Sequence, residues 1–229
     1  MYTLIIGNKN YSSWSFRPWL ALRAAGIAFE ERRLGLCTPE FHQALSRISP
    51  AGLVPVLVDQ GFAVWDTLAI CEYAAERHPQ AQLWPAAPRA RARARSLAAQ
   101  MHSGFGALRQ AMPMNVEAHL PGIAFPQDAL QDVSRIQAIW HDTLAEFGQG
   151  GSHAGAAAPG PFLFGAFSIA DAFYAPVISR FQTYGVQAAG AVRDYMDAVI
   201  ALPAYQQWCT EARAEGTFVP EDEPYRTQR

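Results

Sequence analysis

The amino-acid sequence predicts an α+β protein, in which a small mixed α/β domain is followed by an all-helical domain. Short β-prone runs alternate with helical segments up to about residue 78, and strand signals fade beyond residue 84. Three prolines between residues 79 and 88 indicate a linker. We therefore expect one domain over residues 1–80 and a second over residues 88–229.

The first half contains predicted elements in the order β-α-β-α-β-β-α. An apolar run at residues 2–6 precedes a helix that stops at Gly26, where glycine supplies a left-handed cap. Pro18 is expected in the first turn of that helix, with the N-cap near Trp14 or Ser15. The other elements are expected in AFEERRLGL, PEFHQALSRI, VPVLVD, FAVW and DTLAICEYAAERH.

The second half is predicted to consist of helices. One long helix is expected over PAAPRARARARSLAAQMHSGFGALRQAM and another over DALQDVSRIQAIWHDTLAEF, with at least two more after residue 168. Residues 148–161, rich in glycine, alanine and proline, are expected to form a loop between helices.

Composition argues against several classes of protein. The net charge of −2 gives no electrostatic basis for binding nucleic acid or an anionic membrane. The sequence shows no signal peptide and no apolar stretch near the roughly 20 residues that span a bilayer. The six histidines lack metal-site spacing, and the three cysteines form no disulfide framework. We expect a cytoplasmic protein with no metal, nucleic-acid or membrane partner.

The stretch NYSSWSFRPW, residues 10–19, places a serine pair beside a helix N-terminus. The N-cap is expected near Trp14 or Ser15, so Ser12 and Ser13 would lie just outside the helix, next to its unpaired N–H groups. Such a position attracts an anion, because the N–H groups and the helix dipole both favour negative charge.

Four motifs in this order resemble those of the cytosolic glutathione transferases, and the resemblance covers nearly the whole chain. SSWSFR, residues 12–17, is similar to the zeta-class motif Ser-Ser-Cys-x-x-Arg. SPAGLVPVL resembles the family's turn with a cis proline, and WDTLAICEY resembles its acidic-Ser element. FSIADA carries Ser168 and Asp171 as the family's helix capping box.

The resemblance implies a thioredoxin-like first domain and glutathione as co-substrate. Ser12 is then the first choice for the hydroxyl that stabilises the glutathione thiolate, and Ser13 is the second. A hydrogen bond together with the helix dipole would lower the thiol pKa by about one or two units from roughly 8.5. Trp14 is also expected among the glutathione-binding residues. It stands where the zeta class has cysteine, which weakens the case for the isomerase chemistry of that class.

The resemblance also implies how the rest of the tripeptide is held. A cis bond at Val54–Pro55 would leave the Val54 N–H and C=O free to pair with the cysteinyl backbone. Asp66 would pair with the γ-glutamyl ammonium, while the hydroxyl and N–H of Thr67 would meet its carboxylate.

The glycine carboxylate of glutathione has no clear partner in the sequence. Leu53 stands where many members of the family place Lys or Gln for that contact. The remaining candidates are His42, Gln43 and Arg33.

The second substrate is expected between the domains. SGFGALRQAMPMN resembles the zeta stretch that contributes to glutathione and substrate binding, which assigns Arg109 to both and Met114 and Asn115 to the substrate. SRFQ resembles an Arg-Phe pair, so Arg180 is a candidate to hold a substrate carboxylate. A salt bridge within the helix for Arg109 and a surface position for Arg180 are the structural alternatives.

The function expected from this resemblance is conjugation of glutathione thiolate to small electrophiles, a detoxification chemistry, by a homodimeric enzyme. One alternative is a glutathione-dependent cis-trans isomerase of the maleylacetoacetate or maleylpyruvate type. A second alternative is a non-catalytic binding protein with this fold. In the homodimer, Met101, His102 and Phe105 are expected to pack at the subunit interface rather than to line the substrate pocket.

Overall fold

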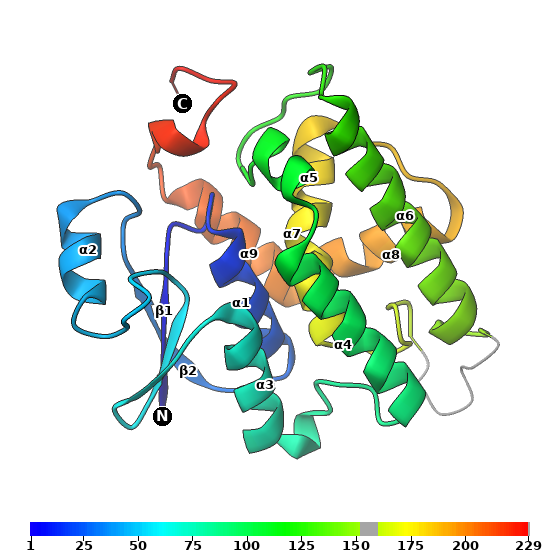
Figure 1. Ribbon diagram of the computed structural model, residues 1–229, viewed down its shortest axis with the longest axis horizontal. Helices are drawn as coiled ribbons and strands as arrows, with labels where there is room; N and C mark the ends of the chain where they lie inside the picture. The colour runs from blue at the N-terminus through cyan, green and yellow to red at the C-terminus, as the bar shows by residue number, and fades with distance from the viewer. Residues whose placement is uncertain (152–159, 229) are drawn as a thin grey trace.

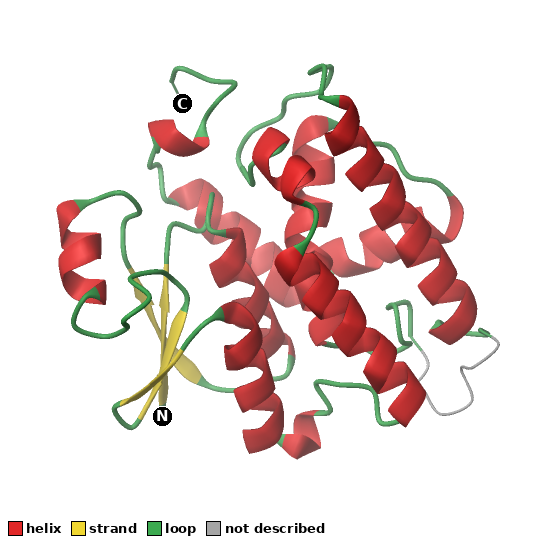
Figure 2. Cartoon of the chain, in the orientation of Figure 1, coloured by secondary structure: helices red, strands yellow, loops and turns green. Residues whose placement is uncertain are grey.

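The computed structural model describes residues 1–151 and 160–228. The N-terminal domain is a small mixed sheet flanked by helices, and the helical C-terminal domain packs against one side of it (Figure 1). Among these residues the strands lie in the N-terminal domain, apart from isolated bridges near residue 164 (Figure 2). The predicted α+β class and the β-α-β-α-β-β-α order are both confirmed.

Within the described residues the sheet has four strands in the order β2-β1-β3-β4. β1 pairs in parallel with β2, with Tyr2 opposite Phe29, and antiparallel with β3, with Tyr2 opposite Asp59. β3 and β4 form an antiparallel hairpin. The strand bounds are Tyr2–Ile6 for β1, Phe29–Arg33 for β2, Val56–Asp59 for β3 and Phe62–Val64 for β4.

Three helices cover the two faces of this sheet. Successive strand residues point to opposite faces of the sheet, so the buried residues of β1 pack on both faces. Leu4 and Ile6 join the main core, which includes helices α1 and α3, whereas Ile5 packs with Phe41 and Leu45 of α2. The helices are α1, Ser13–Ala24, α2, Pro39–Leu45, and α3, Thr67–Arg77.

The start of α1 differs from the prediction. Ser12 is the N-cap, and the helix begins at Ser13 instead of two or three residues later. The expectation that Pro18 lies in the first turn is therefore wrong, because Pro18 lies inside the helix. The left-handed conformation predicted for Gly26 is confirmed, with φ at 68°.

Pro18 leaves a hydrogen-bond acceptor free in α1, because proline has no N–H to donate to the carbonyl four residues earlier. That carbonyl belongs to Trp14, and it accepts a hydrogen bond of 2.9 Å from the hydroxyl of Thr67, the first residue of α3. The interior proline thus allows α3 to attach directly to the first turn of α1, beside the serine pair.

In the described part of the chain two peptide bonds are cis, Val54–Pro55 and Trp65–Asp66. The first confirms the prediction made from the Val-Pro turn. The first lies immediately before β3 and the second immediately before α3.

The helical domain begins at α4, Pro88–Ser103, after a short 3-10 helix η1, Pro79–Ala81. Its other elements are α5, Gly106–Ala111, α6, Gln127–Phe147, α7, Ile169–Tyr184, α8, Gly190–Ile200, α9, Pro203–Ala214, and the 3-10 helix η2, Pro220–Asp222. α7 is almost completely buried and lies against α1, which joins the two domains.

The long helix predicted across SGFGALRQAM is wrong, because the chain breaks between α4 and α5. Gly104 caps α4 where a Cβ atom would lie 2.7 Å from the carbonyl oxygen of Gln100. Phe105 then takes a left-handed conformation with φ at 55°. The break turns α5 away from the axis of α4 (Figure 1).

The predicted capping box at the start of α7 is confirmed. The Asp171 carboxylate accepts hydrogen bonds from the backbone N–H and the hydroxyl of Ser168, and from the backbone N–H of Leu163. All of these groups are buried. Asp171 therefore fixes both the first turn of α7 and the chain that enters it.

After α9 the chain returns to the N-terminal domain (Figure 1). The buried carboxylate of Glu223 accepts hydrogen bonds from the Tyr11 hydroxyl, at 2.7 Å, and from the Asn115 side chain, at 2.8 Å. Arg226 pairs with the same carboxylate. We call residues 217–226 the C-terminal strap.

No helix in the described ranges is long and apolar enough to cross a bilayer. Of the loop predicted over residues 148–161, the central residues 152–159 lie outside the described part of the chain.

Candidate active site

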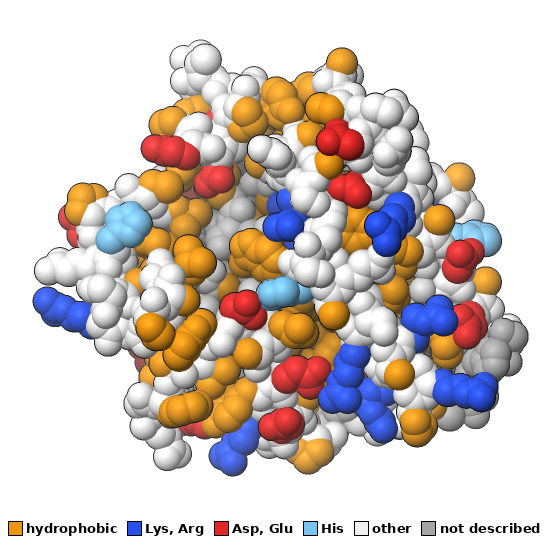
Figure 3. Space-filling model, in the orientation of Figure 1, with side chains coloured by type: hydrophobic (Ala, Val, Ile, Leu, Met, Phe, Trp, Pro, Cys, Tyr) orange, Lys and Arg blue, Asp and Glu red, His pale blue; other side chains and the backbone are white. Residues whose placement is uncertain are grey.

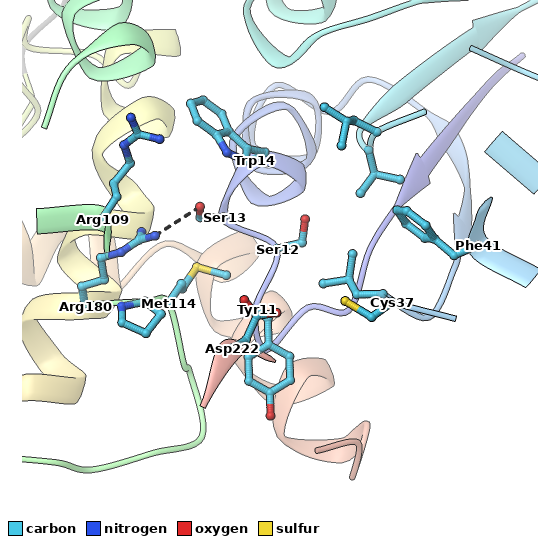
Figure 4. Close-up of a pocket in the computed structure, with 14 residues that line it drawn as sticks. Tyr11, Ser12, Ser13, Trp14, Cys37, Phe41, Arg109, Met114, Arg180 and Asp222 are labelled. Atoms are coloured by element: carbon cyan, nitrogen blue, oxygen red, sulfur yellow. Dashed lines mark hydrogen bonds between the residues drawn. The ribbon is translucent and has the colours of Figure 1, made fainter. Parts of the chain in front are cut away.

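A cleft of about 360 Å³ lies between the two domains. The space-filling view shows the hollow, with hydrophobic side chains on its walls and basic side chains on the helical-domain side (Figure 3). Ser12 lies between two walls, one with Cys37 and Phe41 and the other with Arg109 and Arg180 (Figure 4). The cleft is lined by Tyr11, Ser12, Ser13, Trp14, Leu36, Cys37, Phe41, Leu53, Val54, Arg109, Pro113, Met114, Arg180 and Asp222.

The Ser12 hydroxyl belongs to a short chain of hydrogen bonds. The Ser15 hydroxyl accepts from the Gly7 backbone N–H at 3.2 Å and lies 2.7 Å from the Ser12 hydroxyl. When Ser15 donates its hydrogen to Ser12, the hydrogen of Ser12 remains available to a group in the cleft. Hydrogen bonds arranged in such a chain polarise one another, which strengthens the last donor.

The Ser13 hydroxyl has a different partner. It accepts a hydrogen bond of 3.3 Å from the Arg180 guanidinium (Figure 4). Because Ser13 accepts this bond, its own hydrogen is also free to donate. Both serines are nearly buried at the N-terminus of α1, so both can donate to an anion in the cleft.

Three arginines gather on one side of the cleft. Arg17 is fully buried and Arg180 nearly so, while Arg109 is half-buried. Among the described residues none of them has a carboxylate within salt-bridge distance; they donate instead to carbonyl oxygens, of which Met112 accepts from Arg180 at 2.7 Å.

This arrangement disfavours the charge that these arginines carry. Burial, together with repulsion from Arg109, lowers the pKa of Arg180 to about 10. Burial, with repulsion from Arg180 and Arg109, lowers the pKa of Arg17 well below its ordinary value. One nitrogen of Arg17 has no hydrogen-bond partner. An anion in the cleft would relieve this unbalanced positive charge.

Trp14 occupies the centre of this group of side chains. The guanidinium carbons of Arg17 and Arg109 lie 4.3 and 5.3 Å from the centroid of the Trp14 ring. The His102 ring makes an edge-type contact with Trp14, with the two ring centroids 5.2 Å apart. Cations prefer the face of an indole ring, so Trp14 partly offsets the repulsion between the two arginines.

The residues expected to hold the peptide differ in which of their polar groups are free to bind it. The Val54 backbone borders the cleft, and its N–H and C=O form no hydrogen bond with any residue that the structure describes. Asp66 is exposed, and one of its oxygens caps α3 by accepting from the Leu68 N–H. The Thr67 hydroxyl is committed to the Trp14 carbonyl, so only the Thr67 N–H can meet a ligand.

Other predicted residues divide between the cleft and its surroundings. Met114 lines the cleft, but the Asn115 side chain does not, because it is buried and bonded to Asn10 and Glu223. Leu53 borders the cleft as well. His42, Gln43 and Arg33 do not line it, and Arg33 pairs with Glu215.

Two structural alternatives are wrong. The described residues contain no salt bridge to Arg109, and Arg180 is buried instead of exposed. The expectation that Met101 and Phe105 pack at a subunit interface also fails, since both are buried within the chain.

Sequence reasoning missed three polar residues that line the cleft, Tyr11, Cys37 and Asp222. Tyr11 precedes the serine pair, and its hydroxyl donates to Glu223. Burial, together with this hydrogen bond, raises the pKa of Tyr11 to about 12. Cys37 is an exposed cysteine whose pKa is raised by partial burial and by acidic residues of the C-terminal strap, including Asp222. The only available signal was the position of Tyr11 beside Ser12; nothing in the sequence shows that the strap returns to the cleft.

No cluster of three or more metal-ligating side chains is present in the described part of the chain. The polar groups that line the cleft include the serine hydroxyls at the N-terminus of α1 and the guanidinium groups of Arg109 and Arg180, which are all donors to negative charge.

Comparison with known proteins finds relatives that match part of the chain. The chain is 37% identical to a probable maleylacetoacetate isomerase of Caenorhabditis elegans over 41% of this chain and 44% of that protein. It is 38% identical to a zeta-class glutathione S-transferase of Euphorbia esula over 33% of this chain and 34% of that protein. The aligned region is thus less than half of either relative.

A longer but weaker similarity extends to a stringent starvation protein A homolog of Histophilus somni, with 24% identity over 82% of this chain and 81% of that protein. Among solved structures, a glutathione transferase homolog from Burkholderia GL BGR1 with bound glutathione superposes with a TM-score of 0.68. It is 23% identical and covers 93% of this chain and 98% of that one.

Two family models match the two domains. Residues 11–77 match the glutathione S-transferase N-terminal domain, and residues 130–211 match the glutathione S-transferase C-terminal domain. The first match contains the serine pair, the cis Val54–Pro55 bond and Asp66; the second contains the capping box of α7. With both domains matched and the zeta-like relatives agreeing, the chain belongs to the glutathione S-transferase family.

Proposed function

We propose that this protein is a glutathione transferase in which the Ser12 hydroxyl stabilises the thiolate of bound glutathione during attack on a small electrophile. The observation that carries the proposal is the Ser12 hydroxyl itself, nearly buried at the N-terminus of α1 and backed by Ser15 and the Gly7 N–H. A donor aimed at a sulfur anion lowers the thiol pKa and increases the reactive fraction near neutral pH. Ser13 is the second choice.

The remainder of glutathione is assigned to the N-terminal domain. The Val54 backbone pairs with the cysteinyl unit, Asp66 meets the γ-glutamyl ammonium, and the Thr67 N–H receives the γ-glutamyl carboxylate. The free backbone groups of Val54 and the exposed Asp66 carboxylate support this placement. The sulfur would then lie near Ser12, and the electrophile would enter between Trp14, Met114 and Arg109.

The arginine cluster favours a second candidate function. A glutathione-dependent cis-trans isomerase of the maleylacetoacetate or maleylpyruvate type acts on an enediketo acid, whose carboxylate Arg109 or Arg180 would hold. In this reaction the thiolate adds to the double bond, the bond rotates, and the thiolate leaves. The relatives named as probable maleylacetoacetate isomerases support the same candidate.

The two candidates are separated by assaying chlorodinitrobenzene conjugation beside maleylacetone isomerisation. We expect glutathione-dependent turnover in at least one assay, with conjugation as the primary activity. Glutathione binding with no turnover in either assay would contradict an enzymatic function and favour the non-catalytic alternative.

Replacing Arg109 tests the role of the arginines. Arg109→Met should raise the KM for maleylacetone, which carries a carboxylate, by about 10- to 100-fold, because a hydrogen bond to a charged group contributes about 1.5 to 3 kcal/mol. The KM for uncharged chlorodinitrobenzene should change much less and serves as the matched control. Equal changes for both substrates would show that Arg109 shapes the cleft instead of binding a carboxylate.

We also propose a two-fold homodimer in a cytoplasmic setting. Phe62 and Trp65, at and just after β4, are large exposed apolar side chains that a second subunit would cover. The described cysteines are all unpaired, which suits a reducing compartment. Light scattering at micromolar concentration should give twice the chain mass of 25.1 kDa. A monomer under these conditions would contradict the dimer.

A further inference from the structure

Asp66 contacts the other domain through His102. Nε2 of His102, near the end of α4, lies 3.3 Å from Oδ2 of Asp66, while Oδ1 accepts from the Leu68 N–H. Each carboxylate oxygen therefore has its own partner, one in the N-terminal domain and one in the helical domain. The Asp66 side chain nevertheless remains 58% exposed, so both oxygens can still accept from a ligand.

The surroundings of His102 determine which ring nitrogen faces Asp66. The ring makes an edge-type contact with Trp14, with the ring centroids 5.2 Å apart. The Nδ1 atom of His102 is buried without a hydrogen-bond partner. A proton on Nδ1 would be a buried donor with no acceptor, which is unfavourable. The proton is therefore better placed on Nε2, the nitrogen that lies 3.3 Å from the carboxylate.

We propose that His102 is a positioning residue for glutathione, which holds the Asp66 carboxylate in the orientation that receives the γ-glutamyl ammonium. This inference rests on the proposed function and adds a residue of the helical domain to the glutathione site. His102 does not touch the reacting sulfur. It fixes one carboxylate rotamer before binding, so that less side-chain freedom is lost when the peptide arrives.

Replacing His102 should change the KM for glutathione and not kcat. His102→Phe keeps an aromatic ring against Trp14 and removes both nitrogens. We expect its KM for glutathione to rise about fivefold, in line with the entropy of ordering one side chain, with kcat unchanged. His102→Gln is the matched control, because its side-chain amide can present an N–H near the position of Nε2, and it should remain close to the parent.

The test compares glutathione with an analogue that lacks only the γ-glutamyl amino group, glutaryl-cysteinylglycine. The parent should prefer glutathione, and His102→Phe should lose much of that preference while its KM for the analogue stays unchanged. In an Asp66→Asn background, His102→Phe should have no further effect. This double variant also separates positioning from general damage to the fold. General damage would lower the activity with glutathione and with the analogue below that of Asp66→Asn alone.

Three outcomes would overturn the inference. His102→Phe could keep the parent's preference for glutathione, or His102→Gln could lose it to the same extent as His102→Phe, which would indicate ring packing alone. A parent that does not distinguish the two peptides would also overturn it, and in that case the placement of glutathione at Asp66 in the proposed function fails as well.

Discussion

Ser12→Ala is expected to lose on the order of 10²-fold in conjugation rate near neutral pH, because one preorganised donor to negative charge is removed. The loss should shrink as the pH rises past the free thiol pKa of roughly 8.5, since solution then supplies the thiolate. The KM for glutathione should change little, because Val54 and Asp66 still hold the peptide. A pH-rate profile of variant and parent measures all three effects.

Ser13→Ala is the matched control for this variant. It removes a neighbouring hydroxyl that is bonded to Arg180 but leaves the Ser12 and Ser15 pair intact. We expect a much smaller loss than in Ser12→Ala. Parent-like activity of both variants at about pH 6.5, two units below the ordinary thiol pKa, would contradict the serine assignment.

The helical role of Ser12 has to be separated from its chemical role. Ser12 is the N-cap of α1, and replacing an N-cap serine by alanine costs about 0.5 to 2 kcal/mol of stability. Thermal unfolding of Ser12→Ala should therefore show a modest decrease in Tm. Rates measured well below that Tm report the loss of the donor and not a loss of folded protein.

Asp171→Ala is expected to destabilise the fold by about 4 kcal/mol. The carboxylate accepts from the Leu163 N–H, the Ser168 N–H and the Ser168 hydroxyl, and each orphaned buried donor costs about 1 to 3 kcal/mol. For a chain of this length the Tm should fall by about 10 °C. Calorimetry or circular dichroism during heating would measure it.

Asp171→Asn is the control for that stability prediction. The amide keeps one acceptor oxygen of similar shape, so it should lose clearly less stability than alanine. A decrease below about 1 kcal/mol for Asp171→Ala would mean that the capping box contributes little, since ordinary single substitutions already reach that size.

Sequence periodicity predicted most of the fold, because the elements of the first domain are short and each ends at a strong signal such as Gly26 or Pro79. The errors occurred where tertiary contacts override local rules. Pro18 was assigned to a first turn, yet the helix accommodates it because the Trp14 carbonyl finds Thr67. The break at Gly104 was missed because the apolar pattern continues on both sides of it.

The candidate site could be predicted only in part. The serine pair and Asp66 lie in local motifs, so the sequence was enough to identify them as candidates. The role of Thr67 could not be foreseen, because it depends on a carbonyl in another helix. The same is true of His102, whose contact with Asp66 joins residues 36 positions apart across the domain boundary. The arginine cluster emerges only when α1, α5 and α7 pack together.

The most direct measurement is the thiol pKa of glutathione bound to the protein, followed by the ultraviolet absorbance of the thiolate as the pH is raised. Stabilisation by Ser12 predicts a pKa at least about one unit below the free value of roughly 8.5 in the parent, and a return towards the free value in Ser12→Ala. An unshifted pKa in the parent, or the same shift in parent and variant, would contradict the assignment of Ser12 to the thiolate.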